Sequence, residues 1–288
     1  MRVSFALAPR LGVAAALALA AAVAGETGCL ASPRDGVVFQ SDWSTDTGTS
    51  RRAVTDGGRW NKYFEFNDSG VQLLSVVPEG PGGRNALRVL QRGVHFAAEV
   101  ERDNILPPSK DFYVRFYVRN DDTSSVDDHA VEPGLFADSW NNLIYIRKSS
   151  GSTGWKNVVA TINAGYPVNY WRPNVTLSLG VWYRFEFLVH FVDRTHIQVH
   201  PRVYDASGAL LCSDGDFAQY PFGTAPLWNG SNTWTLAAYY GAGYSFPVDP
   251  RKLVNFVIGN NGQAGAIDTG LPWYFAGVIV RTDWWPGP

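Results

Sequence analysis

The chain has 288 residues, of which 45% are hydrophobic and 14% aromatic, and its 24 basic and 26 acidic residues give a net charge of −2. Because this balance includes no block of Lys or Arg, the composition excludes a nucleic-acid partner. Two cysteines are too few for a cysteine-built zinc ribbon. The 29 glycines and 17 prolines, together with 11 tryptophans, predict short strands separated by turns.

The sequence opens with a segment typical of a secretory signal peptide. Arg2 and Arg10 precede Leu11–Ala24, a run of Ala, Leu, Val and Gly without a charge. The run is shorter than the ~20 apolar residues that a bilayer-spanning helix needs, so we expect no transmembrane segment. Ala22-Val23-Ala24 supplies the small residues that a signal peptidase accepts. We therefore expect an exported protein, whether periplasmic, secreted or on the outer surface. The expected organisation is a signal peptide (1–24), a short N-terminal lead (25–36) and a single domain (37–288).

Cys29 leaves a second interpretation of this end open. A Cys a few residues beyond an apolar run can be the lipidated first residue of a bacterial lipoprotein; Gly28 suits that interpretation, whereas Glu26 does not. A lipid anchor on Cys29 is therefore the alternative to simple secretion. The other cysteine is Cys212, and because two thiols make no framework we expect no structural disulfide.

Beyond the leader, alternation of apolar and polar residues recurs without a helical period. Turn signals rich in Gly, Pro and Asp, such as 78–83 and 205–208, separate the alternating segments. Many strands without interleaved helices predict an all-β, antiparallel sandwich or barrel. The predicted strands, in chain order, are Val71–Val77, Ala86–Gln91, Val94–Val100, Phe112–Arg119, Asn142–Lys148, Val175–Leu179, Trp182–Phe191, His196–Tyr204, Thr233–Tyr240, Leu253–Ile258 and Tyr274–Arg281.

Alternation also predicts which side chains share a face, because successive residues of a strand point to opposite sides. The apolar faces, with Phe116, Phe185, Phe187 and Val199, are predicted to be core. The opposite faces concentrate Tyr, Trp, Arg, His and Gln, which are common at recognition surfaces, although an antiparallel sheet is often simply wet on one side. Candidate substrate-binding residues on these faces are Tyr113, Arg115, Tyr117, Arg119, Tyr145, Arg147, Arg184, Glu186, His190, Arg202 and Tyr204.

Three stretches carry a family resemblance: 93–119, Leu179-Gly180-Val181-Trp182-Tyr183-Arg184-Phe185-Glu186-Phe187, and the turn after Val203-Tyr204. In strand and turn pattern they resemble the concanavalin-A-like lectin/glucanase superfamily, and the jelly-roll polysaccharide lyases look nearest. The resemblance implies a jelly-roll β-sandwich from Val37 onward that handles polysaccharide.

A sharper comparison concerns some alginate lyases of jelly-roll type, which carry Arg-x-Glu-x-Arg, Gln-Ile-His and Tyr-x-Lys-Ala-Gly-x-Tyr strands in that order. This chain has Glu99-Val100-Glu101-Arg102, Gln198-Val199-His200 and Tyr239-Tyr240-Gly241-Ala242-Gly243-Tyr244. The order matches, but the leading Arg is missing and Gly241 stands where the Lys would be. The resemblance implies catalytic roles for Gln198, His200, Tyr239 and Tyr244.

The residue types favour some chemistries over others. Glycoside hydrolysis needs two carboxyl groups across the scissile bond. Because Glu186 is the only carboxylate on its strand face and lies beside Arg184, the sequence disfavours hydrolysis. A lyase needs a group that neutralises a uronate carboxylate, for which Gln198, Arg202 or Arg115 would serve, and a base, for which His200, Tyr239, Tyr244 or His129 would serve. No cofactor is required by either scheme. A Ca²⁺ site built on Asp103, Asp121-Asp122 or Asp127-Asp128 stays open, because no spacing rule selects these residues.

Two function classes therefore remain. We expect a monomeric, exported protein that binds a polysaccharide, either neutral or acidic, in a groove lined by aromatic residues and Arg. The alternative is a polysaccharide lyase that acts by β-elimination on a uronate-containing glycan.

Overall fold

The computed structural model describes the chain from residue 36 onward, with gaps. The described residues are 36–67, 70–90, 96–103, 109, 111–121, 134–138, 141–151, 154–161, 169–173, 175–191, 196–213, 216–219, 233–235, 255–262 and 270–288. The predicted signal peptide, almost all of the lead and Cys29 lie outside this part of the chain. Within it, no helix is long and apolar enough to cross a membrane.

Sheet A has nine strands in the described part of the chain. They are β1 (Val37–Ser41), β3 (Leu74–Val77), β4 (Ala86–Leu90), β6 (Asp111–Asn120), β11 (Trp182–Phe191), β12 (His196–Tyr204), β13 (Leu210–Ser213), β15 (Thr233–Thr235) and β17 (Pro272–Arg281). The order across the sheet is β13-β12-β11-β6-β17-β4-β3, with β1 also paired to β17 and β15 to β12.

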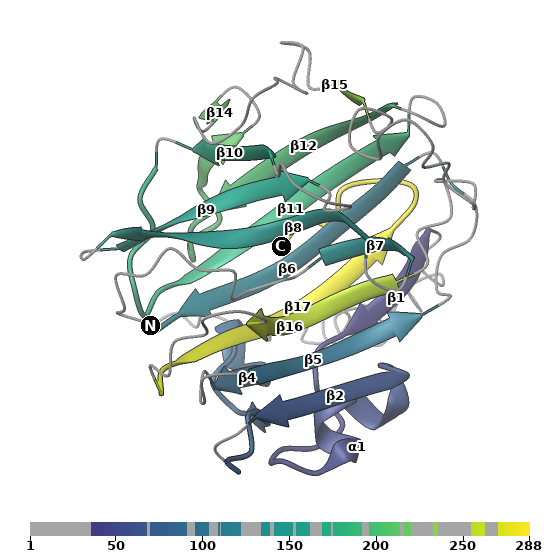
Figure 1. The fold of residues 1–288 in the computed structure, drawn as a ribbon, viewed down its shortest axis with the longest axis vertical. Helices are drawn as coiled ribbons and strands as arrows, with labels where there is room; N and C mark the ends of the chain where they lie inside the picture. Colours follow the sequence, from purple (N-terminus) through teal and green to yellow (C-terminus); the bar gives the residue numbers. More distant parts are fainter. Residues whose placement is uncertain are drawn as a thin grey trace, which may run out of the picture. The chain divides into compact units, whose positions relative to one another are not determined.

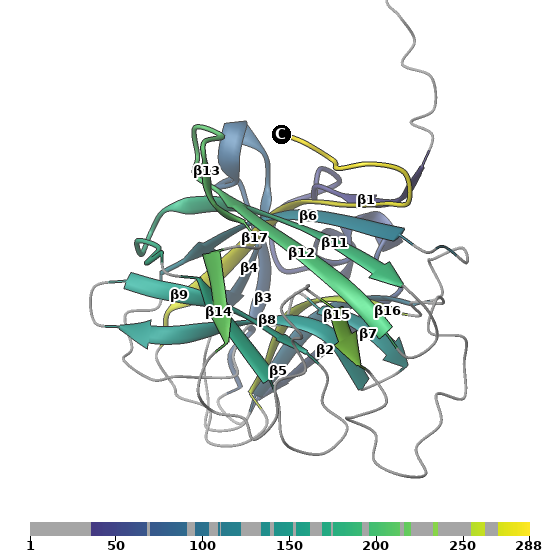
Figure 2. The ribbon, with the colours of Figure 1, turned by 90° about the horizontal axis from the view of Figure 1, so that it is seen from above.

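Sheet B has eight described strands in the order β14-β10-β9-β8-β7-β16-β5-β2. They are β2 (Lys62–Asn67), β5 (Phe96–Asp103), β7 (Gly134–Asp138), β8 (Asn141–Gly151), β9 (Gly154–Thr161), β10 (Asn169–Pro173), β14 (Phe217–Gln219) and β16 (Asn255–Gly262). Figures 1 and 2 show the two sheets as two layers, with sheet B in front in Figure 1 and sheet A behind it. The helices of the described part of the chain are short: α1 (Arg51–Val54) and the 3-10 turns η1 (Asp56–Gly58) and η2 (Pro81–Gly83). The predicted all-β antiparallel sandwich is thus confirmed.

Two strands with strong alternation, β11 and β12, have the predicted bounds. Apolar or aromatic residues stand at every second position of both strands, with Pro201 as one of those of β12. The segment Val175–Leu179, in contrast, was wrongly predicted as a strand. It leads into a turn at Gly180, where φ is +71° and the N–H donates to the carbonyl of Asn120. Its alternation buries Leu177 in the core and packs the partly buried Val175 and Leu179 against it.

The core between the sheets is centred on aromatic side chains, as predicted. Phe116 stacks on Phe185 with ring centroids 5.7 Å apart and an angle of 5° between the planes, and it also stacks on Phe187 at 6.0 Å. All three side chains are buried. The side chain of Val199, the fourth residue predicted to be core, lies outside the described part.

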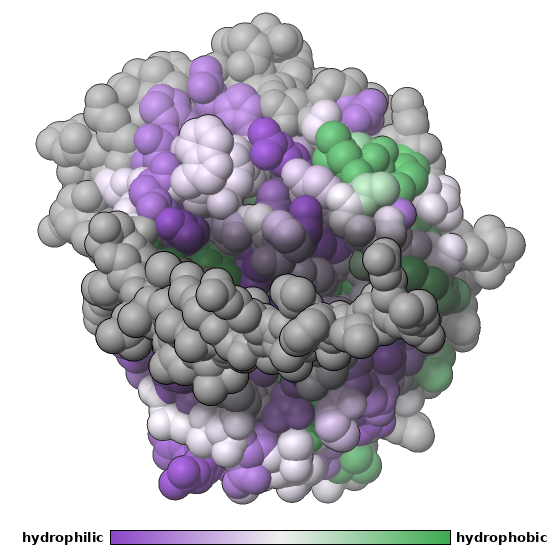
Figure 3. Space-filling view, turned by 180° about the vertical axis from the view of Figure 1, so that it is seen from behind, coloured by the Kyte–Doolittle hydropathy of each residue, from purple (hydrophilic) through white to green (hydrophobic). Residues whose placement is uncertain are grey.

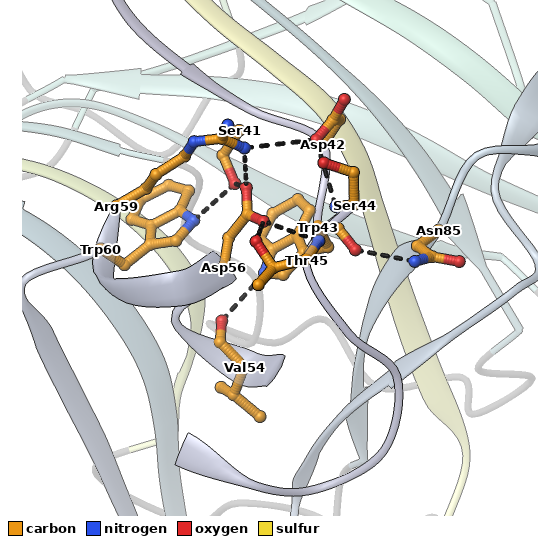
Figure 4. A network of polar contacts seen from close by, with 10 residues as sticks. All are labelled: Ser41, Asp42, Trp43, Ser44, Thr45, Val54, Asp56, Arg59, Trp60 and Asn85. Atoms are coloured by element: carbon orange, nitrogen blue, oxygen red, sulfur yellow. Dashed lines mark hydrogen bonds and ion pairs between the residues drawn. The ribbon is translucent and has the colours of Figure 1, made fainter. Parts of the chain in front are cut away.

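A buried polar network joins β1 to α1 and η1 (Figure 4). Asp56 is 1% exposed, and its carboxylate accepts hydrogen bonds from Ser41 Oγ (2.8 Å), Thr45 Oγ1 (2.9 Å) and Arg59 Nη1 (2.9 Å). Trp60 Nε1 donates to the same Ser41 Oγ at 2.8 Å. Burial raises the pKa of Asp56, but the hydrogen bonds from Arg59, Ser41 and Thr45 outweigh it and hold the pKa below its ordinary value.

Two residues of this network have a strained backbone. Trp43 and Asp56 both have φ near +50°, a region that residues with a Cβ rarely adopt. Trp43 is held there by its indole N–H, which donates to the carbonyl of Val54, and by its own carbonyl, which accepts from Asn85 Nδ2. Stacking of Trp43 on Trp60 at 5.7 Å completes the packing. The network therefore fixes a tight chain path at the edge of the core.

Candidate functional site

The candidate site lies on the face of sheet A that points away from the core, here called the outer face. β6, β11 and β12 are neighbours, and their side chains alternate between core and outer face. The predicted sharing of one face by the Tyr/Arg ladder of β6 and the polar residues of β12 is confirmed by the strand register. Figure 3 shows the molecule from this side, and its described surface is mostly purple to white.

Because residues directly opposite one another on antiparallel strands share a face, the register sorts the outer face into rows. Each row runs from β6 through β11 to β12. The four rows are Asp111, His190 and Gln198; Tyr113, Leu188 and His200; Arg115, Glu186 and Arg202; and Tyr117, Arg184 and Tyr204.

The last two rows contain a buried charged cluster of Arg115, Arg184, Arg202 and Glu186, here called the arginine cluster. Glu186 is 2% exposed, Arg115 5% and Arg184 6%. Arg184 Nε lies 3.3 Å from Glu186 Oε1, and the Arg184 guanidinium lies over the Tyr204 ring at 4.0 Å. Three cations thus surround one carboxylate.

Burial dominates the electrostatics of this cluster. It raises the pKa of Glu186, against the lowering effect of Arg184, Arg202 and Arg115 and of a hydrogen bond with Tyr204. It also lowers the pKa of Arg115. Both shifts reflect the cost of keeping charge away from water.

Residues 283–288 lie over the arginine cluster. Arg115 Nη1 donates to the carbonyl of Gly287 at 2.7 Å, and the Arg202 guanidinium lies 3.7 Å from the centre of the Trp285 ring. Trp285 also packs edge-on against Tyr113, with centroids 5.4 Å apart. Figure 2 shows this yellow segment crossing the outside of the layer formed by β6 and β11. The expectation that Arg115, Arg184 and Glu186 line an open groove is therefore wrong for this conformation, because these side chains are buried beneath other parts of the chain.

The first two rows are more accessible. His190 Nδ1 lies 2.6 Å from Asp111 Oδ1, and the two side chains are 34% and 36% exposed. Gln198 stands opposite His190, and His200 lies in the next row, both half-buried. Burial raises the pKa of Tyr113, and the carboxylates of Asp111 and Asp283 add to the increase. This open part combines an imidazole paired with a carboxylate, an amide, a second imidazole and aromatic rings.

Arg119, at the far end of β6, has internal partners. It pairs with Glu79 (2.7 Å) and Asp121 (3.0 Å) and lies 3.8 Å from the centre of the Tyr274 ring. Burial lowers its pKa, but these carboxylates outweigh burial and raise it. A substrate that binds Arg119 would therefore compete with these ion pairs, one of which joins β6 to the loop before η2.

Other predicted residues lie elsewhere. Tyr145 and Arg147 are on β8 in sheet B, so neither face of their strand is the outer face of sheet A, and the prediction of one shared groove is wrong for them. Glu99 and Glu101 lie on β5, also in sheet B, whereas Gln198 and His200 lie in sheet A. The first two motifs of the alginate-lyase comparison therefore do not meet on one sheet.

Three predicted residues, Tyr239, Tyr244 and His129, lie outside the described residues, as do Asp122, Asp127 and Asp128. In the described part of the chain, no group of three or more His, Cys, Asp or Glu could hold a metal ion. Cys212 is buried on β13, and burial raises the pKa of its thiol to about 12.

Sequence reasoning missed three residues that contribute to the outer face. Asp111 continues the period-two pattern of β6 one step before Tyr113, and this pattern was a signal that could have identified it. Trp285 and Gly287 gave no such signal, because they follow the strand in a segment without alternation.

Comparisons with known proteins identify the fold. No family model matches the chain, and no curated protein matches it by sequence. Among solved structures, the marine PL-14 alginate lyase from Aplysia kurodai is similar, with a TM-score of 0.54 and 11% identity, over 85% of this chain and 99% of that one. Endo-β-1,4-glucuronan lyase from the fungus Trichoderma reesei matches with a TM-score of 0.48 and 14% identity, over 77% and 91%. The chain thus has the all-β jelly-roll sandwich, a fold found among carbohydrate-active proteins.

Proposed function

We propose that the chain is an exported protein that binds a polysaccharide on the outer face of sheet A. The observation that carries the proposal is the convergence, on one half-exposed area, of Asp111, His190 and Gln198 with the ring of Tyr113. Aromatic rings offer flat apolar area to the apolar face of a sugar, and the polar groups offer hydrogen bonds to its hydroxyl groups. The leader at 1–24 supports export, and the jelly-roll fold is compatible with carbohydrate recognition.

The second candidate function is a polysaccharide lyase. The contact between His190 and Asp111 favours it, because a carboxylate orients an imidazole and stabilises its protonated form, as a proton-transfer step requires. In this scheme His200 or His190 removes the proton next to the uronate carboxylate, and Gln198 or Arg202 neutralises that carboxylate. Tyr239 and Tyr244 stay in the proposal as further candidates for the base.

One pair of measurements tests both functions. Titration calorimetry against a panel of neutral and uronate-containing polysaccharides measures binding, and ultraviolet absorbance of the same mixtures detects the unsaturated uronate that elimination creates. Binding without a rise in absorbance supports the recognition protein, whereas a steady rise supports the lyase. Neither binding nor absorbance with any glycan would contradict the proposed function.

A further inference from the structure

Residues 283–288 cannot be held to sheet A as a strand is held. Pro286 and Pro288 have no N–H to donate, and Gly287 has a φ of +67°, far from the extended region. In the described part of the chain, the last hydrogen bond between backbone groups along this path runs from the N–H of Thr282 to the carbonyl of Gly36. The segment beyond is held through side-chain contacts.

Among the described residues, those contacts include both ends of one row and Tyr113 of the next row. Arg115 and Arg202 flank Glu186 on the neighbouring strands, and residues 283–288 contact both: Gly287 through its carbonyl oxygen and Trp285 through its ring. A bidentate pair between Arg281 and Asp283 fixes the start of the segment. A sugar likewise presents acceptor oxygens to Arg side chains and an apolar C–H face to aromatic rings.

The cluster beneath is left electrostatically incomplete by this cover. Three arginines face one carboxylate, and the carbonyl of Gly287 brings no charge. Arg184 Nε and Glu186 Oε1 are buried, and in the described part of the chain neither completes a hydrogen bond. The Asp283 carboxylate is paired with Arg281, and residues 283–288 contact the cluster through two uncharged groups, the Gly287 carbonyl and the Trp285 ring. A ligand carboxylate or sulfate would bring a negative charge to the guanidinium groups and accept their hydrogen bonds, so it interacts with the uncovered cluster more strongly than these two groups do.

We propose that residues 283–288 are a strap that covers the arginine cluster, and that an anionic ligand, on the proposed function an acidic glycan, takes the place of the strap. The inference deepens the proposed function, since it names the ligand class and a means of regulation for the same face. Strap and ligand compete, so the observed affinity is the affinity of the uncovered cluster multiplied by the uncovered fraction.

Two neighbouring tryptophans provide matched variants. Trp285 contacts Arg202 and Tyr113, whereas the side chain of Trp284 is 66% exposed. Two variants, Trp285→Ala and a chain ending at Asp283, should release the strap from the cluster. Two others should leave it bound: Trp284→Ala, which is the control, and Trp285→Phe, which keeps an aromatic ring over Arg202. Circular dichroism establishes that each variant is folded.

The first readout is independent of any glycan. Phenylglyoxal modification of arginine, followed by mass spectrometry, should increase about tenfold at Arg115 and Arg202, the two arginines that the strap contacts, in the two released variants and stay at the wild-type level in the other two. Inorganic sulfate should protect the same arginines in the released variants. If phenylglyoxal modification in the released variants equals that of wild type, the proposal of a strap is wrong. If modification increases but sulfate does not protect the arginines, the proposal of an anionic ligand is wrong.

The second readout is titration with β-1,4-linked glucuronan oligosaccharides and with cello-oligosaccharides, which carry a hydroxymethyl group in place of the carboxylate. The released variants should bind the glucuronan about tenfold more tightly than wild type, with no gain for the neutral sugar. Equal gains for both sugars would contradict an anion-specific strap. Sulfate protection without binding of any glycan would support the proposed strap and contradict only the proposed function.

Discussion

Asp56 is a buried carboxylate that accepts hydrogen bonds from three side chains. Replacing it with Asn removes the charge-assisted hydrogen bond with Arg59, so Asp56→Asn should lower the free energy of unfolding by about 1.5–3 kcal/mol at neutral pH. Denaturant titration measures the change. The control is Asp42→Asn, which changes an exposed carboxylate 3.5 Å from the same guanidinium and should cost under about 0.5 kcal/mol.

The pH dependence of this residue has a definite sign. Because the folded pKa of Asp56 lies below its ordinary value of 3.8, its contribution to stability is fully present above 3.8 and is lost as the pH falls through the lower folded pKa. The difference in unfolding free energy between wild type and Asp56→Asn should therefore be constant from neutral pH to about pH 4 and shrink below it. A difference that stays constant into stronger acid would contradict the assigned network.

His200 separates the two function classes. In a lyase, His200→Ala should remove most turnover and leave affinity nearly intact, because a base acts in the transition state. In a recognition protein, the same change should weaken binding by about 0.5–1.5 kcal/mol, the loss of one hydrogen bond. Calorimetry and absorbance decide between them, with Val181→Ala as an exposed control just before β11. Loss of neither affinity nor turnover would remove His200 from the site.

At the scale of elements, β11 joins the core to the outer face. Phe185 is fully buried and stacks on Phe116 from β6, so Phe185→Ala should cost about 3–5 kcal/mol in a denaturant titration. Leu210→Ala on β13, where the side chain is 53% exposed, is the control and should change stability by under about 0.5 kcal/mol. Similar losses for both variants would show that the assigned register is wrong.

Predictability from sequence follows the physical signal that each element carries. β11 and β12 alternate bulky apolar and polar residues over their whole length, so their bounds and faces could be predicted. β10 (Asn169–Pro173) and β13 were missed, because their sequences are too short to show an alternation that distinguishes them from loops. The burial of the arginine cluster could not be predicted, because it depends on contacts with residues 283–288 that have no local pattern.

At the scale of the whole molecule, a ligand of the outer face should stabilise the fold. Because β6, β11 and β12 hold the proposed site together, a glycan binds the folded state alone, and at a hundred times its Kd it should raise the free energy of unfolding by about 2.7 kcal/mol. Thermal unfolding with and without the glycan measures this effect. For an acidic glycan the gain should shrink as salt is added, whereas a gain unaffected by salt would contradict charge-based recognition.

The position of β17 bears on how the chain reaches its folded state. β17 pairs with β6 on one side and with β4 and β1 on the other. Among the described strands, those of sheet A from the first third of the chain therefore join the rest of the sheet through residues 272–281. Until those residues are synthesised, β4 and β6 have unpaired edges that can join other chains. Such long-range closure makes folding slow and late, which is compatible with the proposed export of the chain.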